Sequence, residues 1–401
     1  MRSVAGLLFA TSLLADDWTV FRSGPFEVVT NNDRKRAREV LNHLEQFRHV
    51  YGQTLNTGKE LTLLWPVRIT MGAKATTDLT LGQDMYVASI AKSGPVPRQW
   101  NRALAIAFLQ ESVPRMPAPI EKGLIDFFTT LQVEETRVMG GTPPENPDRD
   151  WARIHLLMTA DEYYGRVRSL FYNLQQGVAP EPAYKNSLQK TAGDLEKEVD
   201  AWLAKKQWAA ARMNAKPINL ERDFSPRAFD PAKPVAGTGA MAAFDAGDFD
   251  RALQLKPDWP AAKFRAAQKK TDSSEKLKLL EEAAVGARRE SSYWKALAQE
   301  QIAQQKFAEA ARSWGAAERA AADDKERTEI RQAREAIEEQ RVEYEISEKQ
   351  RKKEAAEAEL NRLRNDALAN IRRAEAKANA ELGGRDENAP KPVPWWDDPK
   401  D

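Results

Sequence analysis

The chain of 401 residues has no cysteine and only three histidines. Without cysteine it can form no disulfide, carry no lipid-modified cysteine anchor and use no thiol nucleophile, so its folding must depend on a hydrophobic core. His43 and His49 stand six residues apart on an expected helix, which points them to different faces. We expect these two and His155 to be surface or packing residues rather than metal ligands.

Excess charge of one sign and long apolar runs are also missing. The 61 Lys and Arg residues balance 60 Asp and Glu residues, so the sequence has no concentrated basic stripe and predicts no nucleic-acid partner. No segment after residue 14 approaches the roughly 20 apolar residues of a membrane-spanning helix. The sequence also has no glycine-rich phosphate loop and no Gly-x-Ser-x-Gly elbow, which argues against the enzyme classes that use them.

The first residues have the pattern of a secretory signal. Arg2 is followed by an apolar run over 3–14 and then by Ala15 and two aspartates. We therefore predict a signal peptide over 1–15 and export, best suited to a bacterial periplasm. A buried apolar segment is the alternative interpretation of the same residues.

The next two hundred residues predict an α+β domain. Strand-prone runs and helical apolar spacings alternate, with a Pro- and Gly-rich loop near 140–147. Expected strands are 18–21, 26–30, 61–64, 67–71, 85–90 and 132–139. Expected helices are 33–51, with Asn31 or Asn32 as its cap, then 98–112, 120–131, 160–175 and 191–213.

Two of these helices carry the most informative motif. The helix at 98–112 leads into Pro114-Arg115-Met116-Pro117, and the next helix contains Glu121, Lys122 and Gly123, followed by Phe127-Phe128. This segment, together with 26–31 (FEVVTN), resembles the peptidase MA-like branch of the gluzincin zinc metallopeptidases, whose second helix typically reads Trp-Leu-x-Glu-Gly-Leu-Ala-Glu-Phe-Phe. The resemblance covers 18–205 and implies a zincin-like domain, a small sheet plus helices, over 16–213.

The zinc-binding positions of that family are replaced here. In the matching register, the His-Glu-x-x-His positions fall on Arg102, Ala103, Leu104, Ala105 and Ile106, and the third ligand falls on Lys122. Arginine has no acceptor, alanine and isoleucine have no lone pair, and a charged ammonium repels a cation. We therefore expect the degenerate positions Arg102, Ala103, Ile106 and Lys122 to bind no metal or other cofactor, and the domain to be a pseudopeptidase.

The second half of the chain changes composition. A Pro-rich stretch over 214–239 predicts a linker, and 240–322 predicts all-α helical repeats. One unit resembles a tetratricopeptide repeat, and a weaker copy lies at 243–253. Because a single repeat cannot bury its faces, at least three helical pairs or a neighbouring surface are needed. The residues that carry the resemblance are Trp294, Leu297, Ala298, Phe307, Ala310, Trp314 and Ala317.

A long charged helix is expected over 323–382, because this stretch contains no Gly or Pro. Its last part has a heptad-like apolar rhythm, so we expect either a short coiled coil or a solvated helix held by ion pairs between neighbouring turns. The final residues, 383–401, predict a disordered Pro-rich tail in which Trp395 and Trp396 could dock on a partner or on the protein itself.

These features favour an exported, non-catalytic protein that binds other proteins or peptides. Trp294, Trp314, Trp395 and Trp396 are its candidate partner-binding residues, and the C-terminal helix could mediate self-association. Two alternatives stay open: an active hydrolase or peptidase with an unrecognised site, and a structural envelope spacer that uses the long helix. The sequence does not identify the partner.

Overall fold

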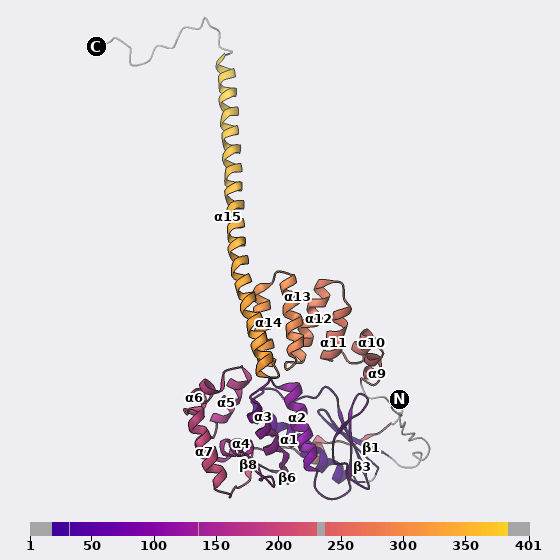
Figure 1. The fold of residues 1–401 in the computed structure, drawn as a ribbon. Coiled ribbons are helices and arrows are strands. Elements are labelled where there is room, and N and C mark those ends of the chain that lie inside the picture. The colour runs from indigo at the N-terminus through magenta and orange to yellow at the C-terminus, as the bar shows by residue number, and fades with distance from the viewer. Residues whose placement is uncertain (1–17, 32, 135, 231–236, 384–401) are drawn as a thin grey trace, which may run out of the picture. The chain divides into compact units, whose positions relative to one another are not determined.

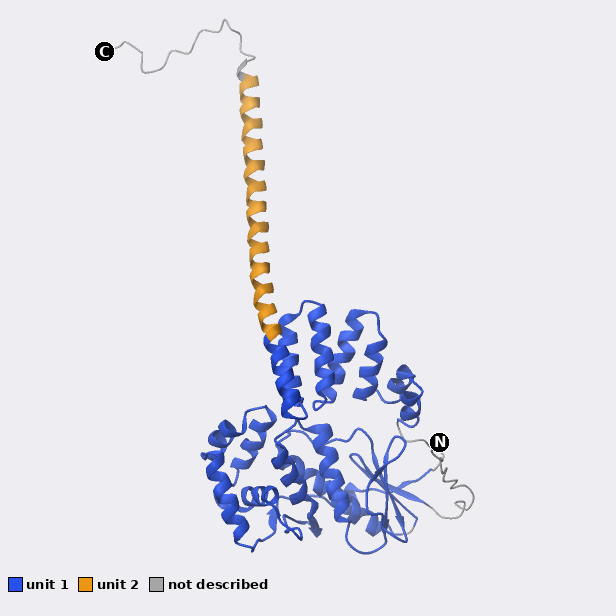
Figure 2. Cartoon of the chain, viewed as in Figure 1, with its two compact units in different colours: residues 1–335 blue, residues 336–401 orange. Residues whose placement is uncertain are grey.

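A computed structural model describes residues 18–31, 33–134, 136–230 and 237–383 of the chain. The fold is α+β and contains two compact units, residues 1–335 and 336–401 (Figure 2). The expected signal peptide and the tail with Trp395 and Trp396 lie outside the described residues. Along those that are described, no helix is long and apolar enough to cross a membrane.

A six-stranded mixed sheet begins the first unit, in the order β4-β5-β3-β2-β1-β9 (Figure 1). β1 (Thr19–Ser23) and β2 (Phe26–Thr30) form the expected hairpin, in which Gly24 adopts a positive φ of 50°. β3 (Val67–Gly72) runs parallel to β2, and β5 (Tyr86–Ala91) runs parallel to β3. The short β4 (Thr80–Leu81) pairs antiparallel with β5.

The strand expected at 61–64 does not form. Its backbone groups bind side chains instead of a sheet partner, because the Leu61 carbonyl accepts from Arg48 and the Leu64 N–H donates to the Glu111 carboxylate. A segment whose backbone groups are satisfied in this way can be partly buried without joining a ladder.

α1 (Arg34–Leu55) contributes a continuous buried face to the main hydrophobic core. Asp33 caps it by accepting from the Arg36 N–H at 2.9 Å, so the predicted cap position, Asn31 or Asn32, was wrong by one or two residues. Its apolar residues recur at three and four positions and are buried as expected. They pack with residues of α2 (Arg98–Ser112) and α3 (Ala118–Thr129) in one cluster.

A second, smaller sheet follows α3. The expected strand at 132–139 is a hairpin of β6 (Gln132–Glu134) and β7 (Arg137–Gly140), and β8 (Ala211–Met213) pairs with β7. The helix predicted to run from 191 to 213 therefore ends early: α7 covers Ala192–Ala204, and the chain then turns back to supply β8.

The remaining helices of this region are α4 (Arg149–Thr159), a 3₁₀ turn (Asp161–Tyr163), α5 (Arg166–Gln175) and α6 (Pro180–Leu188). The predicted helix at 160–175 is interrupted at Gly165, which adopts a φ of 78° that most residues avoid.

Part of the expected linker belongs to the α+β region. α8 (Leu220–Asp223) and β9 (Arg227–Ala228) lie within it, and β9 pairs with the edge strand β1. Phe224 is buried in the main core. Pairing of β9 with β1 satisfies backbone groups that an open edge would leave exposed.

Three consecutive helix pairs follow in the first unit. They are α9 (Ala240–Asp245) with α10 (Phe249–Leu255), α11 (Pro260–Lys269) with α12 (Ser273–Gly286), and α13 (Ser291–Ala303) with α14 (Phe307–Ala320) (Figure 1). Neighbouring helices pack through small buried residues, chiefly alanines. At the start of this array Trp259 packs edge-on against Trp65, with ring centroids 5.1 Å apart.

α15 (Asp324–Gly383) is a single helix of 60 residues, in close agreement with the predicted 323–382. It begins within the first unit, and the second unit starts at Ala336. Its exposed large apolar side chains include Leu360, Leu363, Leu368 and Ile371.

Candidate functional site

The helix pair α2 and α3 carries the residues that match the metallopeptidase motif. The apolar faces of both helices are buried in the core, and α4 packs against α3. Gly123 makes that packing possible, because a Cβ there would lie 2.2 Å from the Asp150 carbonyl oxygen. Close packing against α4 is therefore sufficient to explain why position 123 is glycine in this chain.

Arg102 and Lys122, expected at the first and third ligand positions, both bind the same carboxylate. Arg102 Nη1 lies 2.7 Å from Asp126 Oδ1, and Lys122 Nζ lies 2.9 Å from Asp126 Oδ2. Lys122 also pairs with Asp148. The two cations therefore share the Asp126 carboxylate, and Asp148 is a second compensating acid for Lys122.

Lys122 remains a cation in this cluster. Partial burial lowers its pKa, but the hydrogen bonds to Asp148 and Asp126 outweigh that effect, so the pKa of Lys122 is raised overall. A protonated ammonium has no lone pair for a metal. The other two degenerate positions, Ala103 and Ile106, are half-buried on α2 and supply no donor atom.

Glu121 is the carboxylate closest in sequence to the third ligand position, and it already has partners. One oxygen accepts from the Met116 N–H at 2.7 Å, and the same oxygen pairs with the Arg289 guanidinium. Arg289 comes from the loop between α12 and α13 and also donates to the Val113 carbonyl at 2.9 Å. Glu121 therefore joins the α2–α3 connection to the helical array.

A second arginine strengthens the same junction. Arg115, in the α2–α3 connection, donates to the carbonyl oxygens of Ala320 at 3.2 Å and Arg289 at 3.4 Å. The Pro-Arg-Met-Pro segment of the motif thus contacts the α12–α13 loop and the end of α14. No pattern in the sequence indicated this contact.

A groove of about 400 Å³ lies beside this junction. Its walls come from the 62–64 segment, the end of α2 and the helical array. Trp259 and Tyr293 contribute aromatic surface, and Tyr293 stacks on Phe264 with ring centroids 4.2 Å apart. Carboxyl groups enter the groove from Glu111 and Glu290, and Glu290 is exposed.

Glu111 has the most perturbed carboxyl group of this groove. Burial raises its pKa to about 7, although the Leu64 N–H and the charge of Lys256 act in the opposite direction. Among the described residues it has no ion-pair partner. A carboxyl group of this kind binds or releases a proton near neutrality and would gain from a cationic ligand.

His43 and His155 are buried among other side chains, and His49 is half-buried, with Nε2 2.9 Å from Gln53 Nε2. His43 is buried with Nε2 2.8 Å from Asn101 Oδ1, and His155 lies between the rings of Trp151 and Trp202. Burial lowers the pKa of both to about 4, so both are neutral at pH 7. Within the part of the chain that the structure describes, no group of three His, Cys, Asp or Glu residues could hold a metal ion.

The tryptophans predicted to bind partners are in different situations. Trp314 is only 8% exposed, which makes it a core residue of the array rather than a contact for a partner. Trp294 is half-buried, and its indole N–H donates to the Arg288 carbonyl at 3.4 Å. Trp395 and Trp396 lie outside the described residues.

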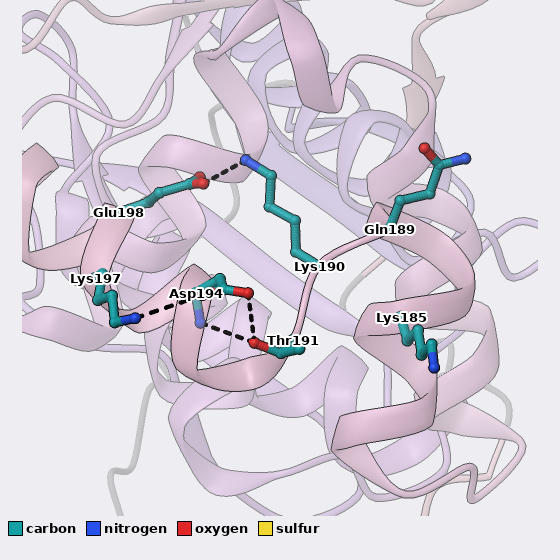
Figure 3. A pocket seen from close by; sticks show the side chains of 7 residues that line it. All are labelled: Lys185, Gln189, Lys190, Thr191, Asp194, Lys197 and Glu198. Atoms are coloured by element: carbon teal, nitrogen blue, oxygen red, sulfur yellow. Dashed lines mark hydrogen bonds and ion pairs between the residues drawn. The ribbon is translucent and has the colours of Figure 1, made fainter.

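Another hollow, of about 560 Å³, lies between α6 and α7 (Figure 3). Two of its cations are already neutralised: Lys190 pairs with Glu198, and Lys197 lies 3.6 Å from Asp194. Thr191 caps α7 by accepting from the Asp194 N–H. Lys190, Thr191, Asp194, Lys197 and Glu198 therefore bind one another in and just before the first turns of α7.

Comparisons with protein-family models, with curated proteins and with solved structures found no match to this chain. The fold and the local chemistry are therefore the basis for any statement about its function.

Proposed function

We propose that the protein is an exported, non-catalytic interaction protein, in which a degenerate peptidase MA-like domain carries tetratricopeptide-like helices. The observation that carries this proposal is the ion-pair cluster of Arg102, Lys122 and Asp126. It occupies the space between two of the positions where the resemblance calls for zinc ligands, and neither cation can coordinate a metal.

The contacts of Glu121 support the same reading. The carboxylate nearest the third ligand position binds Arg289 from the helical array, and Arg115 of the adjoining connection binds the array as well. A surface that would face substrate in a peptidase is here used to hold helices that resemble interaction repeats. The half-buried Trp294 and the groove beside the junction offer apolar and acidic surface to a protein or peptide.

Glu111 favours a second candidate function, hydrolysis at a site unrelated to zinc. A carboxyl group with a pKa near 7 in a groove is a common feature of general acids. Such a reaction also needs a second group within hydrogen-bond reach of the substrate. The hydrogen-bond donor to Glu111 is the Leu64 backbone N–H, so the geometry supports binding better than catalysis.

A zinc and peptidase measurement separates these functions. The purified protein is loaded with zinc and dialysed, its metal content is determined by elemental analysis, and hydrolysis of casein is followed in parallel. We expect no stoichiometric zinc and no hydrolysis. Glu111→Gln serves as the matched variant, because it keeps the hydrogen-bonding shape of the side chain and removes its titration.

Stoichiometric zinc with hydrolysis would overturn the proposal and direct the search for ligands to His155 or Glu121. Hydrolysis that occurs without zinc and is lost in Glu111→Gln would establish the second candidate function instead.

Binding is tested by photocrosslinking. Benzoylphenylalanine at Glu290 places a crosslinker at the mouth of the groove, and the same residue at Lys197 places one at the distant α6–α7 hollow. A protein crosslinked from position 290 and absent from position 197 is the expected result. Equal labelling from both positions would show that the groove is not a specific binding surface.

The length of α15 favours a spacer function as a further alternative. Sixty helical residues at about 1.5 Å each span roughly 90 Å. This function would require the helix to be stabilised along its length.

A further inference from the structure

The last part of α15 has an apolar stripe that repeats every eleven residues. Leu360 and Ile371 are eleven apart, as are Leu363 and Ala374, and 356, 367 and 378 are all alanine. A heptad reading would place Asn370 and Lys377 in the seam, so the heptad-like rhythm expected from the sequence is better described as an eleven-residue repeat. At 3.67 residues per turn this repeat stays on one face of a nearly straight helix, with a slight right-handed supercoil.

This stripe is exposed in the single chain. Leu360 is 67% and Leu363 is 56% accessible to solvent, and Ile371 is exposed to a similar degree. The stripe has a defined beginning, because the positions one repeat earlier are Glu345, Lys349 and Lys352. The helix therefore changes from a polar to an apolar face at about residue 356.

The ion pairs within the helix follow the opposite pattern. Arg341 pairs with Glu345 and Glu338, Arg351 pairs with Glu348, and Arg362 lies 3.8 Å from Glu359. Beyond Arg362, the described residues of α15 form no further ion pair. Pairs between neighbouring turns support an isolated helix, whereas a helix without them needs another surface to cover its apolar face.

The charges beside the stripe identify the partner as a second copy of this helix. With eleven residues per three turns, Glu359 and Arg364 flank the stripe on opposite sides. In a parallel, in-register pair each Glu359 lies next to Arg364 of the other copy, five residues along. An antiparallel pair centred on Ala367 would bring the same flank of each helix together, so Glu359 would no longer meet Arg364 of the other copy.

We infer that the protein forms a parallel, in-register homodimer through the eleven-residue repeat at 356–378 of α15. The seam buries two leucines and an isoleucine from each copy between layers of alanine, which lets the two backbones approach closely. This inference does not depend on whether the N-terminal domain is catalytic, because it concerns a surface on the second unit.

The absence of cysteine makes the orientation directly testable in the full-length protein. Position 363 faces its own copy only when the helices are parallel and in register. Leu363→Cys should therefore crosslink to a disulfide dimer under mild oxidation, whereas Asn365→Cys, on the opposite face, should not. Light scattering of the wild-type protein should give twice the mass of one chain.

Substitutions at the seam and beside it test the energetics. Leu363→Asp should weaken dimerisation on the order of 100-fold, because a charge replaces a buried leucine in both copies. Ala376→Glu, outside the seam on the same helix, is the matched control and should leave the dimer intact. Circular dichroism of each variant checks that the N-terminal unit remains folded.

Charge reversal distinguishes the two orientations. Glu359→Lys should weaken a parallel pair, and adding Arg364→Glu should restore it. A dimer that Glu359→Lys leaves unchanged, or crosslinking only between Leu363→Cys and Ile371→Cys chains, would show an antiparallel pair and overturn the inference. A monomeric mass at tens of micromolar protein would overturn it as well.

Discussion

The contact between Glu121 and Arg289 gives the most informative stability prediction, because it joins the metallopeptidase-like motif to the helical array. Both side chains are largely buried, with Glu121 15% and Arg289 10% exposed. Arg289→Leu would leave the Glu121 carboxylate with the Met116 N–H as its remaining partner and would remove the donor to the Val113 carbonyl. We expect this change to lower the free energy of unfolding by about 2–4 kcal/mol.

The complementary change isolates the pair. Glu121→Gln leaves a buried guanidinium without its carboxylate and should cost about 1–3 kcal/mol. The double variant removes both charges, so its loss should be smaller than the sum of the single losses by about 1–3 kcal/mol. Burial already lowers the pKa of Arg289, with Glu121 acting against that effect, which is consistent with a guanidinium that depends on this partner.

The assay is urea-induced unfolding followed by far-UV circular dichroism, with free energies obtained by linear extrapolation. Arg288→Leu is the matched control, because Arg288 precedes Arg289 in the chain and is exposed, so its loss should stay within about 0.5 kcal/mol. If the single losses add to within about 0.5 kcal/mol in the double variant, Glu121 and Arg289 are not coupled and the proposed junction is wrong.

Three further predictions concern packing, pH and the motif. Gly123→Ala should lower the free energy of unfolding by about 2–4 kcal/mol, because its Cβ would overlap the Asp150 carbonyl. Thermal unfolding measures this loss of stability. An unchanged Tm would contradict the packing of α3 on α4. The pKa of Glu111 in the folded protein, about 7, lies above its ordinary value of 4.5. Between these pH values the folded protein therefore binds more protons than the unfolded protein does. The contribution of Glu111 to stability falls as pH rises through this range. As pH rises from 4.5 to 8, the free energy of unfolding of Glu111→Gln should therefore increase by about 1–3 kcal/mol relative to that of the wild type. Urea unfolding at each pH measures both values. A difference between variant and wild type that stays constant with pH would show that Glu111 titrates normally. Finally, a variant with four changes restores the family pattern: Arg102→His, Ala103→Glu, Ile106→His and Lys122→Glu. It should bind zinc, as measured by isothermal titration calorimetry. A folded variant that binds no zinc would argue against the register in which these residues match the family motif.

Some differences between the predicted and observed elements have a common cause. The strand expected at 61–64 and the helix expected to reach residue 213 both have suitable local sequences. In the structure, side chains from α1 and α2 take the backbone groups of the first segment, and β7 pairs with residues 211–213 of the second. Such partners come from distant parts of the chain, so local periodicity could not reveal them.

The candidate site divides in the same way. That Arg102, Ala103 and Ile106 cannot act as zinc ligands was readable from residue types, because no fold can give arginine, alanine or isoleucine the donor chemistry of histidine. Other features of the site depend on residues that the fold brings together from separate elements. They are the two cations that share Asp126, the contact between Glu121 and Arg289, and the raised pKa of Glu111. Trp314 is a further case, because the sequence placed it on a repeat but only packing showed that it is buried.

The sequence by itself determined the α+β order of the first half, the boundaries of the α2 helix, the long final helix and the lack of zinc-donor chemistry in Arg102, Ala103, Ile106 and Lys122. These follow from local periodicity, from the positions of proline and glycine, and from side-chain chemistry. Tertiary structure alone decided the strand order, the use of the expected linker as an edge strand, and the contact between the peptidase-like motif and the helical array. These depend on pairing and burial between residues far apart in the chain, where many local sequences are compatible with more than one partner.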